Sequence, residues 1–201
     1  MSRFAWFVAG AWIVLVVIAL VGFIALRDAH GFSALDPPTA SERWIAETAR
    51  DMAMPADAKN RTNPIADSSE ALAEARAHWA DHCASCHANN GSGDIEMGKH
   101  LYPPAPDMRG AGTQNKTDGE LFFIIQNGIR MTGMPGWGAS GHEEDSWKLV
   151  RFIRHLPQLS TQEELDMQEL NPRTPDELKE EQEEKDFLNG AKPNEPVPHH
   201  H

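Results

Sequence analysis

The amino-acid sequence predicts an all-α protein. Three stretches between residues 69 and 159 carry apolar residues at helical spacing between start and stop signals. Loops rich in glycine and proline separate them. No stretch shows the alternation of apolar and polar residues that a half-buried strand would have. The hydrophobic fraction is 40%, but much of it lies in the first 26 residues, so the remainder has a small core for its length.

The first segment, residues 1–27, is predicted to be a membrane anchor. Phe4 to Leu26 is a run of 23 residues without a charge, and as a helix it would be roughly 35 Å long, enough to cross a bilayer core of about 30 Å. A cleaved signal peptide is the alternative, but its apolar core is shorter, about 7–15 residues. Arg3 before the run favours a cytoplasmic N-terminus, with the rest of the chain outside.

Residues 28–68 are predicted to form a tether that contains one short helix. Gly31, Pro37 and Pro38 favour an extended start. A helix is predicted from Ser41, its proposed cap, to Met54. One stripe of this helix is largely apolar: Trp44, Ile45, Thr48, Ala49 and Met52. We expect the helix to cover its own domain, and a partner surface is the alternative.

Residues 69–159 are predicted to form the compact domain, with three helices and two long loops. The helices expected are Ser69 to His82, Asp118 to Asn127 and Glu143 to Leu156, with Gly128 and Pro157 as stop signals for the last two. The loops, residues 88–117 and 128–141, are rich in glycine.

Residues 160–201 form an acidic tail that is predicted to be partly helical or disordered. The tail holds twelve acidic and four basic side chains, a net charge of −8 out of −12 for the chain. A pattern that resembles a capping box is formed by Ser160 or Thr161 with Glu163 or Glu164. A second helix-start signal begins at Thr174. The final three histidines are either a tag remnant or a native metal-binding tail. The chain lacks a basic stripe, which argues against nucleic acid as a partner.

The sequence Cys83-Ala84-Ser85-Cys86-His87 predicts covalent attachment of one haem c. Two thiols three positions apart can each reach one vinyl group, and the histidine that follows faces the iron. A thioredoxin-type pair would need a strand–helix setting, and the pair here follows a helix. A zinc site would need further ligands, for which His78, His82 and His100 are the candidates.

The second axial ligand is predicted to be Met134. It lies 47 residues after His87, in a glycine-rich loop between two predicted helices, and Pro135 stiffens the loop. A histidine–methionine pair suits an electron carrier because it raises the reduction potential. Met131 is the nearest alternative, and an open iron or a histidine such as His100 or His142 is the other.

Residues 69–159 resemble a class I c-type cytochrome of the membrane-anchored bacterial monohaem type. The motifs that carry the resemblance are Trp79 to His87, Pro104 to Met108, Gly133 to Gly138, and Trp147 to Ile153. The family's fold has three main helices around one haem. It implies that the first and last helices cross at an aromatic contact, between Trp79 and the Trp147–Phe152 face, where Ala75 permits close approach.

The resemblance also assigns ligands. Cys83 and Cys86 would form thioethers, His87 would be the proximal iron ligand and Met134 the distal one. The carbonyl of Pro106, or alternatively Pro104, would accept a hydrogen bond from the His87 ring.

Other positions would surround the haem. Met108 would line it, and Arg109 and Arg130 would pair with its propionates or remain solvated. The haem edge between Met134 and Trp137 would contact the partner.

Together these features predict a carrier of single electrons, not an enzyme. Haem c is attached outside the bacterial inner membrane in this family, which agrees with the orientation inferred from Arg3. The expected partners are the lipid bilayer and membrane redox complexes of a respiratory chain: a quinol-oxidising complex, a terminal oxidase or a dehydrogenase. A cytochrome subunit of a periplasmic dehydrogenase is the alternative, and an open iron would allow peroxidase or gas-binding chemistry.

Overall fold

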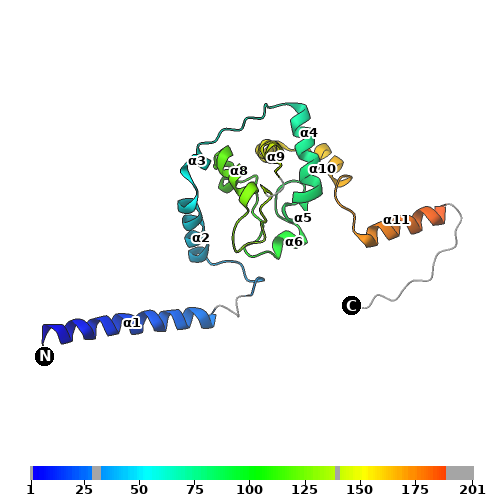
Figure 1. The fold of residues 1–201 in the computed structure, drawn as a ribbon. Coiled ribbons are helices and arrows are strands. Elements are labelled where there is room, and N and C mark those ends of the chain that lie inside the picture. Colours follow the sequence, from blue (N-terminus) through cyan, green and yellow to red (C-terminus); the bar gives the residue numbers. More distant parts are fainter. Residues whose placement is uncertain (1, 29–32, 139–140, 189–201) are drawn as a thin grey trace.

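All regular secondary structure in the described residues is helical and no strand is present among them, which confirms the predicted class (Figure 1). The structure is a computed structural model that describes residues 2–28, 33–138 and 141–188. A group of helices around one core occupies the middle of the chain.

The N-terminal helix α1 (Arg3–Asp28) is long and apolar, as predicted. Its large apolar side chains are exposed along its whole length. Among the helices that the structure describes, it alone has the length and composition to cross a membrane.

Two helices precede the compact domain. They are α2 (Ala40–Ala53) and α3 (Ala56–Lys59). The sequence predicted Ser41 as the cap of α2, but the structure shows that the cap is Thr39. Thr39 is extended, and its hydroxyl accepts from the backbone N–H of Glu42, while the Glu42 carboxylate accepts from the backbone N–H of Thr39 at 2.7 Å. This reciprocal pair satisfies two donors at the helix start, which explains why α2 begins there.

Three helices enclose the core, and α4 crosses α9. Their bounds are α4 (Ser69–His78), α8 (Asp118–Asn127) and α9 (Glu143–His155). Ala75 is 1% exposed at the crossing, so its small side chain allows close approach. The rings of Trp79 and Phe152 meet there with centroids 5.5 Å apart, which confirms the expected aromatic contact. Phe122 of α8 stacks on Trp147 of α9 at 4.0 Å.

The first helix of the domain was predicted to run unbroken from Ser69 to His82, but the structure interrupts it after His78. A π-helical turn, η2 (Trp79–Cys83), follows α4, and a single α-helical turn, α5 (Ala84–His87), follows η2. The backbone N–H of Ala84 donates to the carbonyl of Trp79, five residues earlier. A π turn adds a residue to the helical register and so redirects the side chains that follow it.

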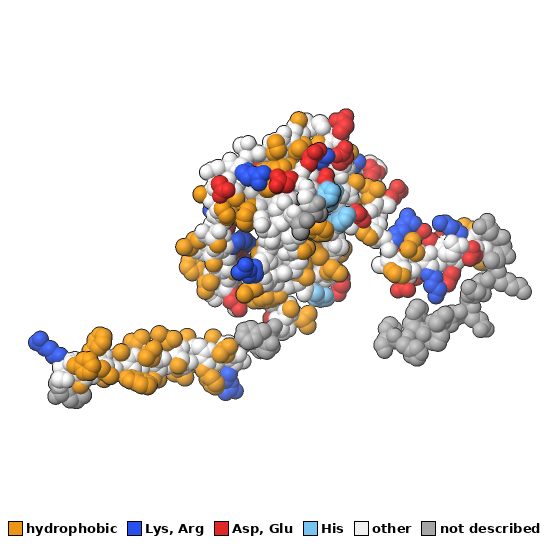
Figure 2. Space-filling view, viewed as in Figure 1, with side chains coloured by type: hydrophobic (Ala, Val, Ile, Leu, Met, Phe, Trp, Pro, Cys, Tyr) orange, Lys and Arg blue, Asp and Glu red, His pale blue; other side chains and the backbone are white. Residues whose placement is uncertain are grey.

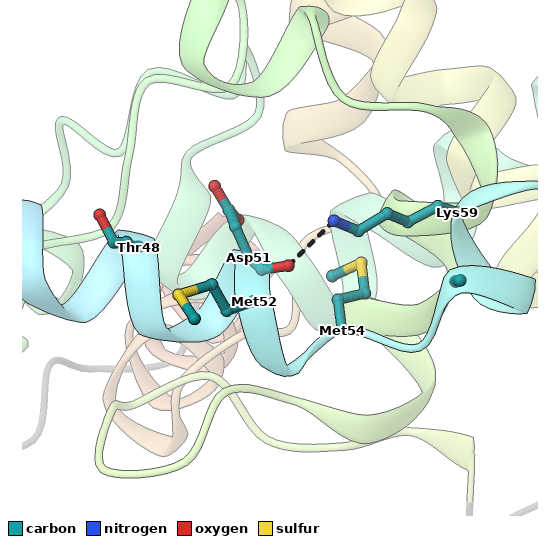
Figure 3. Close-up of a pocket in the computed structure, with 6 residues that line it drawn as sticks. Thr48, Asp51, Met52, Met54 and Lys59 are labelled. Atoms are coloured by element: carbon teal, nitrogen blue, oxygen red, sulfur yellow. Dashed lines mark hydrogen bonds between the residues drawn. The ribbon is translucent and has the colours of Figure 1, made fainter.

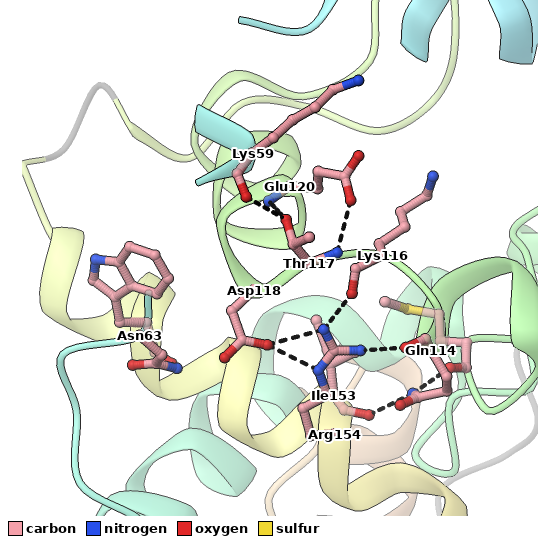
Figure 4. A network of polar contacts seen from close by, with 11 residues as sticks. Lys59, Asn63, Gln114, Lys116, Thr117, Asp118, Glu120, Ile153 and Arg154 are labelled. Atoms are coloured by element: carbon pink, nitrogen blue, oxygen red, sulfur yellow. Dashed lines mark hydrogen bonds and ion pairs between the residues drawn. The ribbon is translucent and has the colours of Figure 1, made fainter. Parts of the chain in front are cut away.

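The long loop before α8 is attached to α9 by polar contacts (Figure 4). It contains two short helices, α6 (Glu96–Lys99) and α7 (Ala111–Gln114). The Gln114 amide donates to the carbonyls of Met108 and Ile153, at 2.8 and 2.9 Å. The Arg154 guanidinium pairs with Asp118 and donates to the carbonyls of Gln114 and Lys116. Because side chains of α7 and α9 donate to backbone carbonyls of this loop, the contacts fix its path.

The beginning of the acidic tail packs on the domain. After η4 (Leu156–Gln158), Ser160 and Glu163 form the predicted capping box at the start of α10 (Thr161–Gln168). Glu163 also lies 3.0 Å from the His155 ring nitrogen, and Met167 is fully buried in the core. The charged helix α11 (Pro175–Leu188) has no buried residue, and the terminal histidines lie outside the described residues.

Replacing Met167 with alanine is therefore expected to destabilise the protein by about 2–5 kcal/mol, because it leaves a cavity in the core. Urea unfolding in detergent, followed by haem absorption, measures the change. Leu165→Ala on the same helix is the control, since Leu165 is half exposed and should cost much less. Equal costs for the two variants would contradict the packing of α10 on the domain.

Candidate functional site: the haem attachment turn

The attachment motif lies at the end of the first helical run of the domain. Cys83 ends η2, while Cys86 and His87 lie on α5. Both thiols are free and half-buried in the protein chain. Helix α5 ends at His87 because Ala88 takes a positive φ of 60°. The Trp79 indole N–H donates to the Ala88 carbonyl at 3.1 Å and so holds this reversal.

The thiols do not have the character of a dithiol redox pair. Burial, with a smaller contribution from Cys86, raises the pKa of the Cys83 thiol to about 12. A redox-active Cys-x-x-Cys pair has a lowered thiol pKa, so that one cysteine is a thiolate near neutral pH. Among residues 2–28, 33–138 and 141–188, no three His, Cys, Asp or Glu side chains are placed to hold a metal ion. These facts favour thioether attachment over the two alternatives.

His87 has the environment of an axial ligand. Burial lowers the pKa of its imidazole, which keeps the ring neutral and able to bind iron. Its Nδ1 is buried and has no hydrogen-bond partner among the described residues. The Trp79 ring lies beside it, with centroids 5.7 Å apart. A neutral imidazole and two thiols on adjacent turns fit a covalently bound haem.

The loop after His87 presses tightly against the motif. The backbone N–H of Gly93 donates to the His87 carbonyl at 2.9 Å. A Cβ added at Gly93 would lie 2.4 Å from the Ala105 carbonyl oxygen and 3.3 Å from that of Pro106. The structure thus brings Pro106 close to the attachment turn, but it does not form the predicted hydrogen bond to His87 Nδ1. That bond stays a prediction.

Gly98→Ala is expected to destabilise this turn. A Cβ at Gly98 would lie 2.2 Å from the Cys86 carbonyl oxygen and 2.7 Å from that of Gly93. Backbone must shift to make room, which should cost about 1–3 kcal/mol and lower the yield of attached haem. The measurements are unfolding in urea and the ratio of haem to protein. Gly112→Ala is the control, because a Cβ there meets nothing within 4 Å. A Gly98 variant as stable as the control would contradict the close approach.

The Met134 loop is closely packed against the end of α8. Gly128 ends the helix with a φ of 65°, and a Cβ there would lie 2.6 Å from the Met134 carbonyl oxygen. That oxygen accepts from the Ile129 N–H at 3.0 Å, and the Met134 N–H donates to the Thr132 hydroxyl at 3.1 Å. Met134 is half-buried, whereas Met131 is 91% exposed. Because its loop is held in place and its side chain is half-buried, Met134 is favoured over Met131 as the second iron ligand.

The other predicted positions differ in how well their surroundings agree with their roles. Met108 and Trp137 are partly buried and pack against the core, and the Trp137 ring lies 5.6 Å from that of His82. Arg109 forms a paired contact with Asp107, at 2.9 Å for each bond, so its guanidinium is already matched with a carboxylate. Arg130 is exposed.

The alternative histidine ligands lie at the surface. His100 pairs with Glu96 at 3.3 Å and His142 with Asp145 at 3.2 Å, and both rings are more than half exposed. Sequence reasoning missed the roles of Trp79 beside His87 and of Gly98 against Cys86. The indole nitrogen and the loop glycine are visible in the sequence, but what each touches is not.

A helix-end Cys-x-x-Cys-His turn, a crossing of the first and last helices and a rigid methionine loop define a class I c-type cytochrome domain. Residues 70–153 match the family described as cytochrome c oxidase, cbb3-type, subunit III. No match to this chain is found among curated proteins. The domain carries one haem c bound covalently through Cys83 and Cys86, and its chemistry is electron transfer.

Proposed function

We propose that this chain is a membrane-anchored periplasmic cytochrome that passes single electrons between partners of a respiratory chain. Helix α1 crosses the inner membrane once, with the N-terminus in the cytoplasm and the haem domain in the periplasm. The haem, when bound, supplies a one-electron couple. His87 and Met134 would hold the iron, and with both as ligands no position would be left for a substrate, so the protein would be a carrier and not an enzyme.

The packing of the Met134 loop is the observation on which this proposal chiefly rests. Met134 is half-buried in a loop whose backbone is fixed by Gly128, Ile129 and Thr132, while Met131 is 91% exposed. A fixed thioether needs little rearrangement to bind iron, and small rearrangement favours rapid electron exchange. Met108 and Trp137 are partly buried against the core, which agrees with the proposal that they line the haem.

The free tether is shorter than the predicted 28–68 segment. The Thr117 hydroxyl donates to the Lys59 carbonyl at 2.9 Å, and the Asn63 amide donates to the Trp147 carbonyl at 2.9 Å. The Arg151 guanidinium donates to the Ile65 carbonyl at 2.6 Å. The segment from Lys59 to Ile65 is thus bonded to the domain, which favours a domain that stays close to the membrane.

A terminal oxidase is the partner that we favour. The matching family is described as an oxidase subunit, and a short tether suits a domain that works within or beside one complex. The acidic tail provides charge for docking to a basic surface. A quinol-oxidising complex is the expected electron donor. The second candidate is a cytochrome subunit of a periplasmic dehydrogenase.

Purification from native membranes in mild detergent tests this assignment. We expect the chain to co-purify with oxidase subunits, to be reduced by a quinol-oxidising complex and to show a low-spin haem c spectrum. In intact spheroplasts, protease added outside should cut the haem domain from the anchor. Co-purification with a dehydrogenase alone would favour the second candidate, and a haem domain protected from protease would contradict the orientation.

A further inference from the structure

Helix α2 presents an apolar face to the outside. We call Trp44, Ile45 and Met52 the outer face of α2; they are 67%, 57% and 82% exposed. The sequence stripe was expected to cover the domain, and this expectation is wrong. Figure 2 shows hydrophobic side chains at the left edge of the domain, where Figure 1 places α2.

Helix α2 turns a polar face to its own domain instead. The Glu42 carboxylate lies near the Tyr102 hydroxyl and, after burial, contributes to the raised pKa of that phenol. The Arg50 Nε is buried, and Asp51 lies 3.8 Å from the Lys116 ammonium. On a helical projection, Arg50 is about half a turn from the outer face. The domain therefore uses the polar side of α2 and leaves the apolar side uncovered.

The outer face continues into a pocket at the bend between α2 and α3 (Figure 3). The pocket has a volume of about 470 Å³ and is lined by Thr48, Asp51, Met52, Met54, Ala56 and Lys59. The Lys59 ammonium donates to the Asp51 carbonyl at 2.9 Å and closes one side of the bend. Two methionine side chains give the pocket a deformable apolar wall.

We infer that the outer face of α2 lies in the interface of the lipid bilayer, beside the membrane helix α1. The inference rests on the proposed anchor. Only residues 29–39 separate α1 from α2, and this chain spans at most about 40 Å when fully extended. Trp44 begins the outer face five residues after Thr39, and tryptophan is favoured at the membrane–water interface. An amphipathic helix with such a face binds the interface in its plane.

The charge of α2 indicates the kind of lipid surface. The helix has three acidic residues, Glu42, Glu47 and Asp51, and two basic ones, Arg43 and Arg50. With no excess of positive charge, it gains nothing from anionic lipids. Contact must come from apolar burial, so a zwitterionic surface is sufficient.

Contact of α2 with the bilayer would fix the orientation of the haem domain. Helix α3 presses on α8 so closely that a Cβ at Gly119 would lie 2.0 Å from the Ala58 carbonyl oxygen. Met54, at the junction with α2, is buried. The chain after α2 is therefore rigidly attached to the domain, and the haem is held at one angle to the membrane.

Single-cysteine variants of the full holoprotein test the inference. Because Cys83 and Cys86 are bound to haem, an added cysteine is the only free thiol. Ile45→Cys and Met52→Cys place it on the outer face, and Ala46→Cys, which is exposed on another side of α2, is the matched control. In phosphatidylcholine vesicles we expect a water-soluble maleimide to react about tenfold more slowly at positions 45 and 52 than at 46.

Flotation with the vesicles and the haem spectrum are recorded for each variant. Equal rates at positions 45, 46 and 52 in floated protein would overturn the inference and leave the proposed function standing. Protection in native membranes but not in pure lipid vesicles would overturn it in favour of a protein partner, and protection that disappears on dilution into more vesicles would favour a second copy of the chain. Loss of flotation would overturn the anchor and the inference together.

Discussion

Met134→Ala is expected to open the iron to external ligands. The ferrous variant should bind carbon monoxide rapidly and in proportion to its haem, while the parent protein should not. The ferric variant should lose the weak red absorption band of methionine-bound haem. Its reduction potential should fall, because loss of the methionine removes the ligand that raises it. The measurements are absorption spectra with and without carbon monoxide and a redox titration.

The surrounding loop should survive this change. The contacts that hold it are made by the Met134 backbone, which accepts from Ile129 and donates to Thr132. An alanine keeps both bonds, so a spectral change would report the lost thioether and not a collapsed loop. Unfolding in urea, measured on the same sample, checks this point.

Met131→Ala is the matched control, because the two methionines lie three residues apart in one loop. Met131 is 91% exposed, so its loss should leave a six-coordinate haem that does not bind carbon monoxide. If instead Met131→Ala opened the iron and Met134→Ala did not, the ligand would be Met131 and not Met134. If both variants stayed closed, a histidine would be the ligand, and His100 and His142 would be the next positions to change.

Local signals predicted several elements with their boundaries. Helix α8 runs from Asp118 to Asn127, as expected, because a capping box begins it and Gly128 ends it with a positive φ. Contact between Trp79 and Phe152 followed from the family resemblance and is present. Five adjacent residues were sufficient to predict the haem attachment site. Each of these features depends on neighbours in sequence or on a known pattern.

Other features depend on packing that no local pattern contains. The stripe on α2 showed that one face is apolar, but the polar contacts of Glu42 and Asp51 decide which face the domain binds. Met167 lies in the acidic tail, where no local pattern indicates burial, yet it completes the core. The π turn before Cys83 has no sequence signal that distinguishes it from an ordinary helix. The role of Pro106 remains a prediction, since His87 Nδ1 lacks a partner.

Trp79→Ala is expected to be the most destabilising single change in the core. The side chain is 2% exposed and lies between Phe152 and His87, with ring centroids 5.5 and 5.7 Å away. Its removal should cost about 3–5 kcal/mol, measured by urea unfolding in detergent. Trp44→Ala, which removes an exposed tryptophan, is the control and should cost far less.

Trp79→Phe separates packing from hydrogen bonding at the same position. A phenyl ring retains much of the apolar contact with Phe152 but cannot donate to the Ala88 carbonyl, which the indole does at 3.1 Å. The loss should be about 1–3 kcal/mol, since the carbonyl is left without its donor. Ala88 reverses the chain directly after His87, so this variant should also loosen the proximal ligand. A higher pH midpoint for loss of the haem ligand on acidification would show that the bond positions His87. A lowered stability with an unchanged acid midpoint would show that the bond stabilises the turn without positioning His87.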